Sequence, residues 1–213
     1  MDTAPDRRTR KRLVTRQAIS DAATRLFFER GFDRVTVDEI ADAADVGRMT
    51  VFNHFPRKED MFFDLDGEVQ QLAFQAVRTR ESGVPPVEAL RRLAHRMISE
   101  RHPLVALFEG TDRFVQTVTA SEALKARARQ MRDDFTRALG TLLAEAAGQP
   151  ADDPCGQLAA GLIVSAWSVA LAQGQTVFDR TRDLGAARGA FLALVDRGAV
   201  GTAAALGDTP YIR

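Results

Sequence analysis

The 213-residue sequence contains one cysteine, Cys155, and only three histidines, His54, His95 and His102. A single cysteine cannot form a disulfide within the chain, which agrees with a reducing compartment. The histidines are too far apart in sequence for a recognisable zinc motif. No glycine-rich phosphate loop follows a strand pattern, and Cys155 has no histidine near it in sequence. The sequence therefore predicts no metal site, no cofactor and no catalytic residue.

The chain also lacks an excess of charge of either sign, because 29 basic residues balance 29 acidic residues. Nothing global attracts it to nucleic acid or to an anionic membrane. The basic N-terminus is not followed by the apolar stretch of a secretory signal. The longest apolar run, 158–172, has about 15 residues and falls short of the roughly 20 that span a bilayer. We expect a soluble, cytoplasmic protein without a membrane partner, in which any nucleic-acid binding comes from local charge.

Alternating apolar and polar residues are almost absent, whereas apolar residues recur at helical spacing from end to end. This pattern predicts an all-α protein of about nine helices. Helices are expected over about 10–30, 37–44, 48–55, 58–81, 87–102, one or two within 104–119, 121–147, a segment around 158–172, and a last one from about 184. The lengths indicate a three-helix N-terminal domain, 1–57, and a larger helical bundle, 58–213.

The second and third helices have the plan of a helix-turn-helix, whose second helix enters the major groove of DNA. Thr36 is a candidate N-cap, and Glu39 completes a capping box. The segment 44–47 forms the turn, where Asp45 tolerates a left-handed conformation. In the third helix, the outward residues are expected to be Gly47, Arg48, Met49, Thr50, Asn53 and His54, which are mostly short or hydrogen-bonding.

These outward residues suit contacts to DNA. Arg48 can bind guanine with two hydrogen bonds, Asn53 can bind adenine or a phosphate, and Met49 can contact a thymine methyl group. Thr50 and His54 can bind phosphates. Lys58, together with the free amides at the start of the fourth helix, offers another phosphate site. A solvated polar face is the plain alternative for these residues.

The segment 7–16 concentrates basic residues and contains no acidic residue. It holds Arg7, Arg8, Arg10, Lys11, Arg12 and Arg16. Such an arm can neutralise phosphates or enter the minor groove. A charge run that is merely solvated, as terminal runs often are, is an equal alternative.

From about Arg10 to Leu65, the sequence resembles the TetR family of one-component transcriptional repressors. The resemblance lies in GFDRVTVDEIADAADVGRMTVFNHFPRKEDMF, with its Gly-Phe, capped helix, turn, Thr-x-aromatic-x-x-Phe and x-x-Lys-Glu. It implies a homodimer that binds an inverted repeat in double-stranded DNA, and a C-terminal domain that dimerises and binds a small molecule.

The resemblance also implies roles for single residues. Family base-contacting positions correspond to Arg48, Met49 and Phe52, and positions that meet the DNA backbone correspond to Thr36, Thr50, Asn53, His54 and Lys58. Two positions depart from the family pattern. Phe52 stands where members often have Tyr, which removes a phosphate hydrogen bond, and Asp45 stands where the turn often has Gly.

The C-terminal half resembles the family only in length and helix rhythm. Met97, Phe108, Phe114 and Phe135 are apolar enough to line a cavity for a small apolar or amphipathic ligand, although each suits a plain core. The last two helices suit a four-helix dimer interface, because the segment 158–172 is apolar on every face and must be covered. The expected interface residues are Leu158, Trp167, Phe178, Phe191 and Val195.

The sequence thus predicts a sequence-specific DNA-binding regulator, a repressor that a ligand releases by shifting the fourth helix. Two other classes remain open. An architectural DNA-binding protein would have similar basic features with little sequence preference, and a helical ligand carrier would make no use of Arg48.

Overall fold

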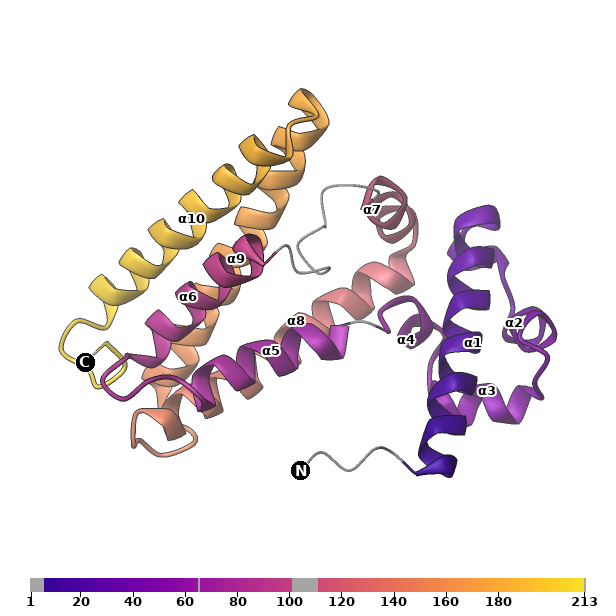
Figure 1. Ribbon diagram of the computed structural model, residues 1–213, viewed down its shortest axis with the longest axis horizontal. Coiled ribbons are helices and arrows are strands. Elements are labelled where there is room, and N and C mark those ends of the chain that lie inside the picture. The colour runs from indigo at the N-terminus through magenta and orange to yellow at the C-terminus, as the bar shows by residue number, and fades with distance from the viewer. Residues whose placement is uncertain (1–5, 65, 101–110, 213) are drawn as a thin grey trace. The chain divides into compact units, whose positions relative to one another are not determined.

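The computed structural model describes residues 6–64, 66–100 and 111–212, and all regular structure in these ranges is helical, which confirms the all-α fold (Figure 1). Within the described ranges, ten α-helices and the 3-10 helix η1 follow one another. Their order is α1 (Arg7–Arg30), η1 (Phe32–Arg34), α2 (Val37–Ala43), α3 (Arg48–His54), α4 (Lys58–Phe62), α5 (Asp66–Arg78), α6 (Pro86–Ser99), α7 (Thr111–Ala120), α8 (Glu122–Ala146), α9 (Pro154–Thr181) and α10 (Leu184–Ala205).

The helices form two compact units, which differ from a division at residue 57. The first unit comprises 1–66 and 112–128, and the second comprises 67–111 and 129–213. The first unit therefore contains α4, most of α7 and the first turns of α8 in addition to the three N-terminal helices. The functional division into a DNA-binding part, 1–57, and a ligand-binding part, 58–213, stays a prediction.

The core of the first unit holds the short helix α3 in place. Val51 of α3 and Phe55, which directly follows this helix, have no exposed surface, and they belong to one apolar cluster with Ile19 and Phe27 of α1 and Ile40 of α2. A seven-residue helix is not stable alone in water, because nucleation costs more than so few hydrogen bonds return. Burial of Val51 and Phe55 therefore fixes α3 on α1 and leaves its other face to solvent.

Local backbone chemistry sets the angle between α2 and α3. Thr36 caps α2 as expected: its hydroxyl accepts from the amide of Glu39 at 3.2 Å, and the carboxylate of Glu39 accepts from the amide of Thr36 at 2.8 Å. Asp45 has a positive φ of 52°, which confirms the left-handed residue expected in the turn. The amide of Val46 then donates to the carbonyl of Ala41 at 3.0 Å and closes the turn.

Residues far along the chain complete the first unit. Phe114 of α7 stacks on Phe62 of α4, with ring centroids 4.8 Å apart. Ser121, just before α8, donates to Asp33 at 2.8 Å. Arg127 of α8 pairs with Asp60 of α4 at 2.8 Å, and both side chains are largely buried. The sequence pattern gave no signal for these contacts.

Two expected elements differ from those observed. The helix expected over 58–81 is two helices, because α4 ends at Phe62 and α5 begins at Asp66. Between them, Phe63 packs edge-on against Phe62, and Asp64 pairs with Arg16 of α1, so tertiary contacts override the helical pattern. The first helix begins at Arg7 rather than near residue 10, since Asp6 caps it by accepting from the amide of Thr9 at 2.6 Å. The part of the expected 104–119 region that precedes α7 lies outside the described residues.

In the second unit, α9 and α10 run side by side as a long pair (Figure 1). The two helices approach closely, because a Cβ atom added at Gly198 of α10 would lie 2.3 Å from the Cβ of Ala166 of α9. By length and composition alone, α9 is apolar enough to cross a membrane. Its Ala160, Ile163 and Val164 belong to the core of the unit.

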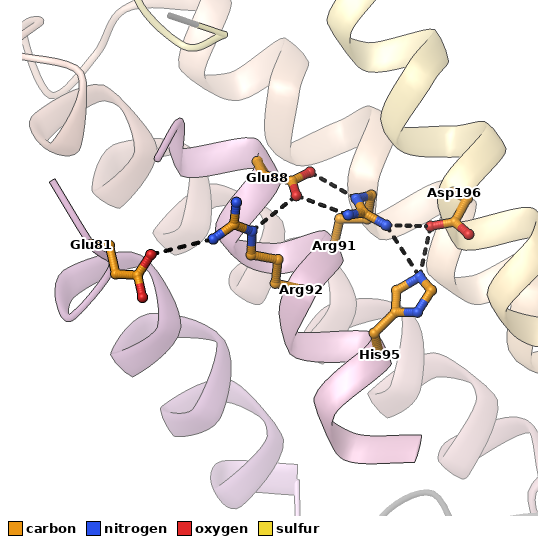
Figure 2. Close-up of polar contacts among 6 residues, drawn as sticks. All are labelled: Glu81, Glu88, Arg91, Arg92, His95 and Asp196. Carbon is orange, nitrogen blue, oxygen red and sulfur yellow. Dashed lines mark hydrogen bonds and ion pairs between the residues drawn. The ribbon is translucent and has the colours of Figure 1, made fainter. Parts of the chain in front are cut away.

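A chain of charged side chains joins α6 to α10 within the second unit (Figure 2). Asp196 of α10 accepts from Arg91 at 3.0 Å and lies 2.8 Å from Nε2 of His95. Glu88 binds both Arg91, at 2.7 Å, and Arg92, at 3.0 Å. Hydrogen bonds from the two α6 side chains to Asp196 lower the pKa of this carboxyl group against the opposing effect of burial. Such half-exposed pairs contribute little to stability, but they fix the register of α6 on α10.

Removing the Thr36 hydroxyl is expected to weaken the start of α2. Thr36→Ala should lower the free energy of unfolding by about 1 kcal/mol, and Thr36→Ser, which keeps the cap, should restore it. Hydrogen bonds from Thr36, followed by Arg30, lower the pKa of Glu39 to about 2. The contribution of the ionised Glu39 carboxylate to the free energy of unfolding is therefore complete above about pH 4.5 and is lost as the pH falls toward 2. Urea unfolding at pH 7 and pH 3 measures both effects; equal stability of Thr36→Ala and wild type at pH 7 would contradict the role of the cap.

Candidate DNA-binding surface

The outward face of α3 is polar and lies opposite the buried Val51. Met49 is 71% exposed, and Arg48 and Asn53 are also exposed. Thr50, Phe52 and His54 are half-buried. The structure thus gathers six of the expected DNA-binding residues on one short helix. Their side chains offer hydrogen-bond donors, acceptors and one apolar contact at helical spacing, which is what base edges in a major groove require.

Arg48, the first residue of α3, is held by two neighbours. Its Nη1 atom donates to both carboxylate oxygens of Asp38 in α2, at 2.7 and 2.9 Å. Its guanidinium carbon lies 5.5 Å from the centre of the Phe52 ring. Arg48 is therefore positioned rather than freely mobile, although it remains 59% exposed. Asp38 lies ten residues away on the preceding helix, and no sequence pattern indicated that it would bind Arg48.

A basic hollow lies beside α3. It is lined by Arg8, Lys11, Arg12 and Thr15 of α1, and by Asn53 and His54 of α3. Three of the arm's basic side chains thus lie beside the end of α3, in a position to bind a phosphate oxygen together with Asn53. Burial, together with the charges of Arg12 and Arg16, lowers the pKa of His54, so its ring is neutral at pH 7. His54 can therefore exchange hydrogen bonds with a phosphate, but it adds no positive charge.

Arg16 has a structural role instead. It donates from Nη1 to the backbone oxygen of His54 at 2.7 Å, it pairs with Asp64, and its guanidinium carbon lies 4.0 Å from the centre of the Phe55 ring. These contacts hold the end of α3 on α1. Of the six basic residues expected to form a phosphate-binding arm, Arg16 is thus already bound to other groups of the fold.

Thr36 and Lys58 are also engaged in contacts within the fold. Both the hydroxyl and the amide of Thr36 are used by the capping box with Glu39. The Nζ atom of Lys58 donates to the carbonyl of Phe32 at 2.5 Å and lies 4.2 Å from the centre of that ring. Burial lowers the pKa of Lys58, against the opposing effect of Asp33. The expected phosphate contacts of Thr36 and Lys58 therefore compete with contacts that stabilise the first unit.

Two of the expected ligand-binding residues share one apolar cluster. Met97 is buried in the core of the second unit, where Phe135 packs against the same cluster and stacks on Phe74 with centroids 5.9 Å apart. Phe114 belongs to the first unit, where it stacks on Phe62. Phe108 lies outside the described residues. Among the described residues, no group of three or more acidic, histidine or cysteine side chains could hold a metal ion.

Most of the expected dimer-interface residues face the interior of their own protomer. Phe178, Phe191 and Val195 are at most 7% exposed, and Trp167 packs edge-on against Phe191. They close the core between α9, α10 and α6, and so they cannot form the surface that a second copy would touch. Leu158 is 48% exposed and remains available. The all-apolar pattern of 158–172 did not distinguish the face that packs within the protomer from the exposed face, and the dimer interface stays a prediction.

The comparisons with known proteins agree with this surface. Residues 19–65, from α1 to the end of α4, match the family model "Bacterial regulatory proteins, tetR family". The match covers the N-terminal part of the chain, which is thus similar to the DNA-binding region of TetR-family regulators. The chain is similar to the transcriptional regulator TcmR of Streptomyces glaucescens, with 31% identity over 86 residues, which make up 40% of this chain and 38% of TcmR. The chain thus matches less than half the length of this relative.

Two solved structures show the same fold over nearly the whole chain. The structure of a TetR-family regulator from Mesorhizobium loti MAFF303099 aligns with 91% of this chain and over 97% of its own length, with a TM-score of 0.56 and 17% identity. SmeT, in its complex with triclosan, aligns with 90% of this chain and over 91% of its own length, with a TM-score of 0.54 and 22% identity. Identity at this level shows the fold alone. It does not show the activity of the whole protein.

A matched pair of lysine substitutions separates structural charge from DNA-binding charge. Lys58→Gln should lower the free energy of unfolding by about 1 to 2 kcal/mol, because the carbonyl of Phe32 loses its partner. Lys11→Gln should leave stability within about 0.5 kcal/mol and reduce the salt slope of DNA binding by about 1. Urea unfolding and binding titrations over a range of salt concentrations measure the two effects. A reduced slope with unchanged stability for Lys58→Gln would show that this lysine binds phosphate instead.

Proposed function

We propose that this chain is a TetR-family sequence-specific DNA-binding regulator of transcription, a repressor and not an enzyme, that acts in the cytoplasm. One observation carries the proposal: α3 presents Arg48, Met49 and Asn53 to solvent beside the basic hollow on α1. Base-reading groups and phosphate-binding groups therefore share one surface, as sequence-specific binding requires. A repressor bound near a promoter would then exclude RNA polymerase.

We propose that the regulator is a homodimer on an inverted repeat. Exposed apolar side chains on α9 and α10 support this: Val169 is 59% exposed and Val200 is 71% exposed. Leu158 precedes Val169 by 11 residues, close to three helical turns, so both lie on one stripe of α9. Such a stripe favours a second copy of the same helix pair. Two copies of α3 would then reach major grooves about 34 to 36 Å apart.

We propose further that a small apolar or amphipathic ligand releases the DNA. SmeT, which has the same fold, is seen in complex with triclosan. In this chain, the cavity lined by α6, α9 and α10 measures only about 10 Å³, room for about one water molecule. Phe135 of α8 does not line this cavity but packs against the same apolar cluster, so a larger ligand in this core would have to displace side chains such as Phe135. Ligand affinity and DNA affinity would then oppose each other reciprocally.

The break between α4 and α5 changes the proposed coupling element. The fourth helix was expected to run without interruption from the DNA to the ligand, but α4 ends at Phe62. The 25-residue helix α8 is continuous instead, and it carries Arg127 in the first unit and Phe135 in the second. Because Arg127 pairs with Asp60 next to the helix-turn-helix, displacement of Phe135 would act on a helix that is tied to the DNA-binding unit.

Selection of binding sites from random duplex DNA tests the proposed function. The wild-type protein should select an inverted repeat at near-physiological salt, and Arg48→Ala should weaken binding by about 1 to 3 kcal/mol and relax one base in each half-site. Binding without a consensus sequence would favour an architectural protein. Absence of DNA binding in protein that is free of bound small molecules would favour a ligand carrier.

Substitution of the exposed valines tests the dimer. Val169→Arg combined with Val200→Arg should convert the dimer into a monomer, because two cations per subunit would be buried without partners. Val115→Arg, which changes an exposed valine of α7, serves as the control and should leave the dimer intact. Sedimentation equilibrium measures both. A wild-type protein that stays monomeric at every concentration would contradict the proposal.

A further inference from the structure

Asp38 and Arg48 form a pair at the start of the two helix-turn-helix helices. Asp38 is the second residue of α2, and Arg48 is the first residue of α3. The turn that contains Asp45 in its left-handed conformation brings these two helix starts together. Both side chains are well exposed, Arg48 to 59% and Asp38 to 60%. An ion pair so exposed contributes little to folding, so stability alone gives no reason for it.

The contact leaves a particular edge of the guanidinium available. Nη1 of Arg48 donates hydrogen bonds to both carboxylate oxygens of Asp38. Among the described residues, Nη2 and Nε of Arg48 have no hydrogen-bond partner, and together they form one of the bidentate edges of the guanidinium. Guanine presents O6 and N7 side by side in the major groove, and an arginine edge of this kind matches them. The pair thus directs a bidentate donor away from the protein.

We propose that Asp38 is a positioning residue for base recognition: by holding Arg48 at Nη1, with Phe52 beside the guanidinium, it orients the remaining edge toward guanine. The inference rests on the proposed function, because it requires that α3 reads DNA. A side chain fixed before binding loses less rotamer freedom on binding, and a fixed edge tolerates fewer alternative bases. The negative charge of Asp38 also offsets the charge of Arg48, which reduces its attraction to phosphates of any sequence.

Asp42 provides a matched control. It lies one helical turn beyond Asp38 on α2 and is exposed. Within the described part of the chain, the Asp42 side chain has no hydrogen-bond or ion-pair partner. Asp42→Asn and Asp38→Asn therefore remove the same charge from neighbouring positions on one helix, and only Asp38→Asn breaks the charged contact of two carboxylate oxygens with Arg48.

The test measures base preference in each half-site with the full-length protein on its selected duplex and on single-base variants. The base that Arg48→Ala relaxes defines the position that Arg48 reads. Asp38→Asn should reduce discrimination at that position alone by about three- to tenfold, a part of what a bidentate arginine supplies. Asp42→Asn should leave discrimination unchanged. Both variants should bind non-specific duplex slightly more tightly and should unfold at the wild-type temperature.

A double-mutant cycle separates positioning from other effects. In the Arg48→Ala background, Asp38→Asn should cause no further change in base preference, because its effect passes through Arg48. Unchanged discrimination in Asp38→Asn, or tighter specific binding with discrimination intact, would overturn the inference; the latter would mean that Asp38 only masks Arg48. Failure of the wild-type protein to select a consensus sequence would instead overturn the proposed function itself.

Discussion

Burial of Val51 and Phe55 is the contact on which the DNA-binding surface depends. The two side chains are fully enclosed among α1, α2 and α4, and each contributes about 1.5 to 3 kcal/mol. A helix of seven residues has no other means of staying folded. Because one face of α3 is committed to this core, the positions of Arg48, Met49 and Asn53 on the opposite face follow directly. Arg16 adds a second attachment by binding the backbone oxygen of His54 at the end of the helix.

The basic residues near α3 divide into two groups with different tasks. Arg16 and Lys58 are bound to carbonyl groups and aromatic rings of the fold, whereas Arg8, Lys11 and Arg12 line an open hollow. In a chain without net charge, this division matters, because the second group remains open to supply local attraction to phosphates. Arg48 belongs to neither group. Its charge is offset by Asp38, and its remaining donors suit recognition of a base rather than of a phosphate.

Local signals predicted the helix-turn-helix well. Thr36 with Glu39, the left-handed Asp45 and the alternation of buried and exposed residues in α3 are all encoded within a few residues of one another. Contacts between distant residues were not predictable in this way. The break after Phe62 depends on Asp64 meeting Arg16, and the attachment of α8 depends on Arg127 meeting Asp60. For α9 and α10, an all-apolar composition cannot tell the face that packs within the protomer from the exposed face, and Phe191, which was expected at an interface, is buried within its own protomer.

The central claim is that α3 reads base edges in the major groove, and methylation interference on the selected duplex tests it most directly. Methylation of guanine N7 occupies the acceptor that Arg48 is proposed to use. Methylation of one guanine in each half-site should block binding of the wild-type protein, and the two guanines should be related by the symmetry of the repeat. Arg48→Ala should become insensitive to the same methylation. Undiminished binding of the wild-type protein to methylated duplex would contradict the account.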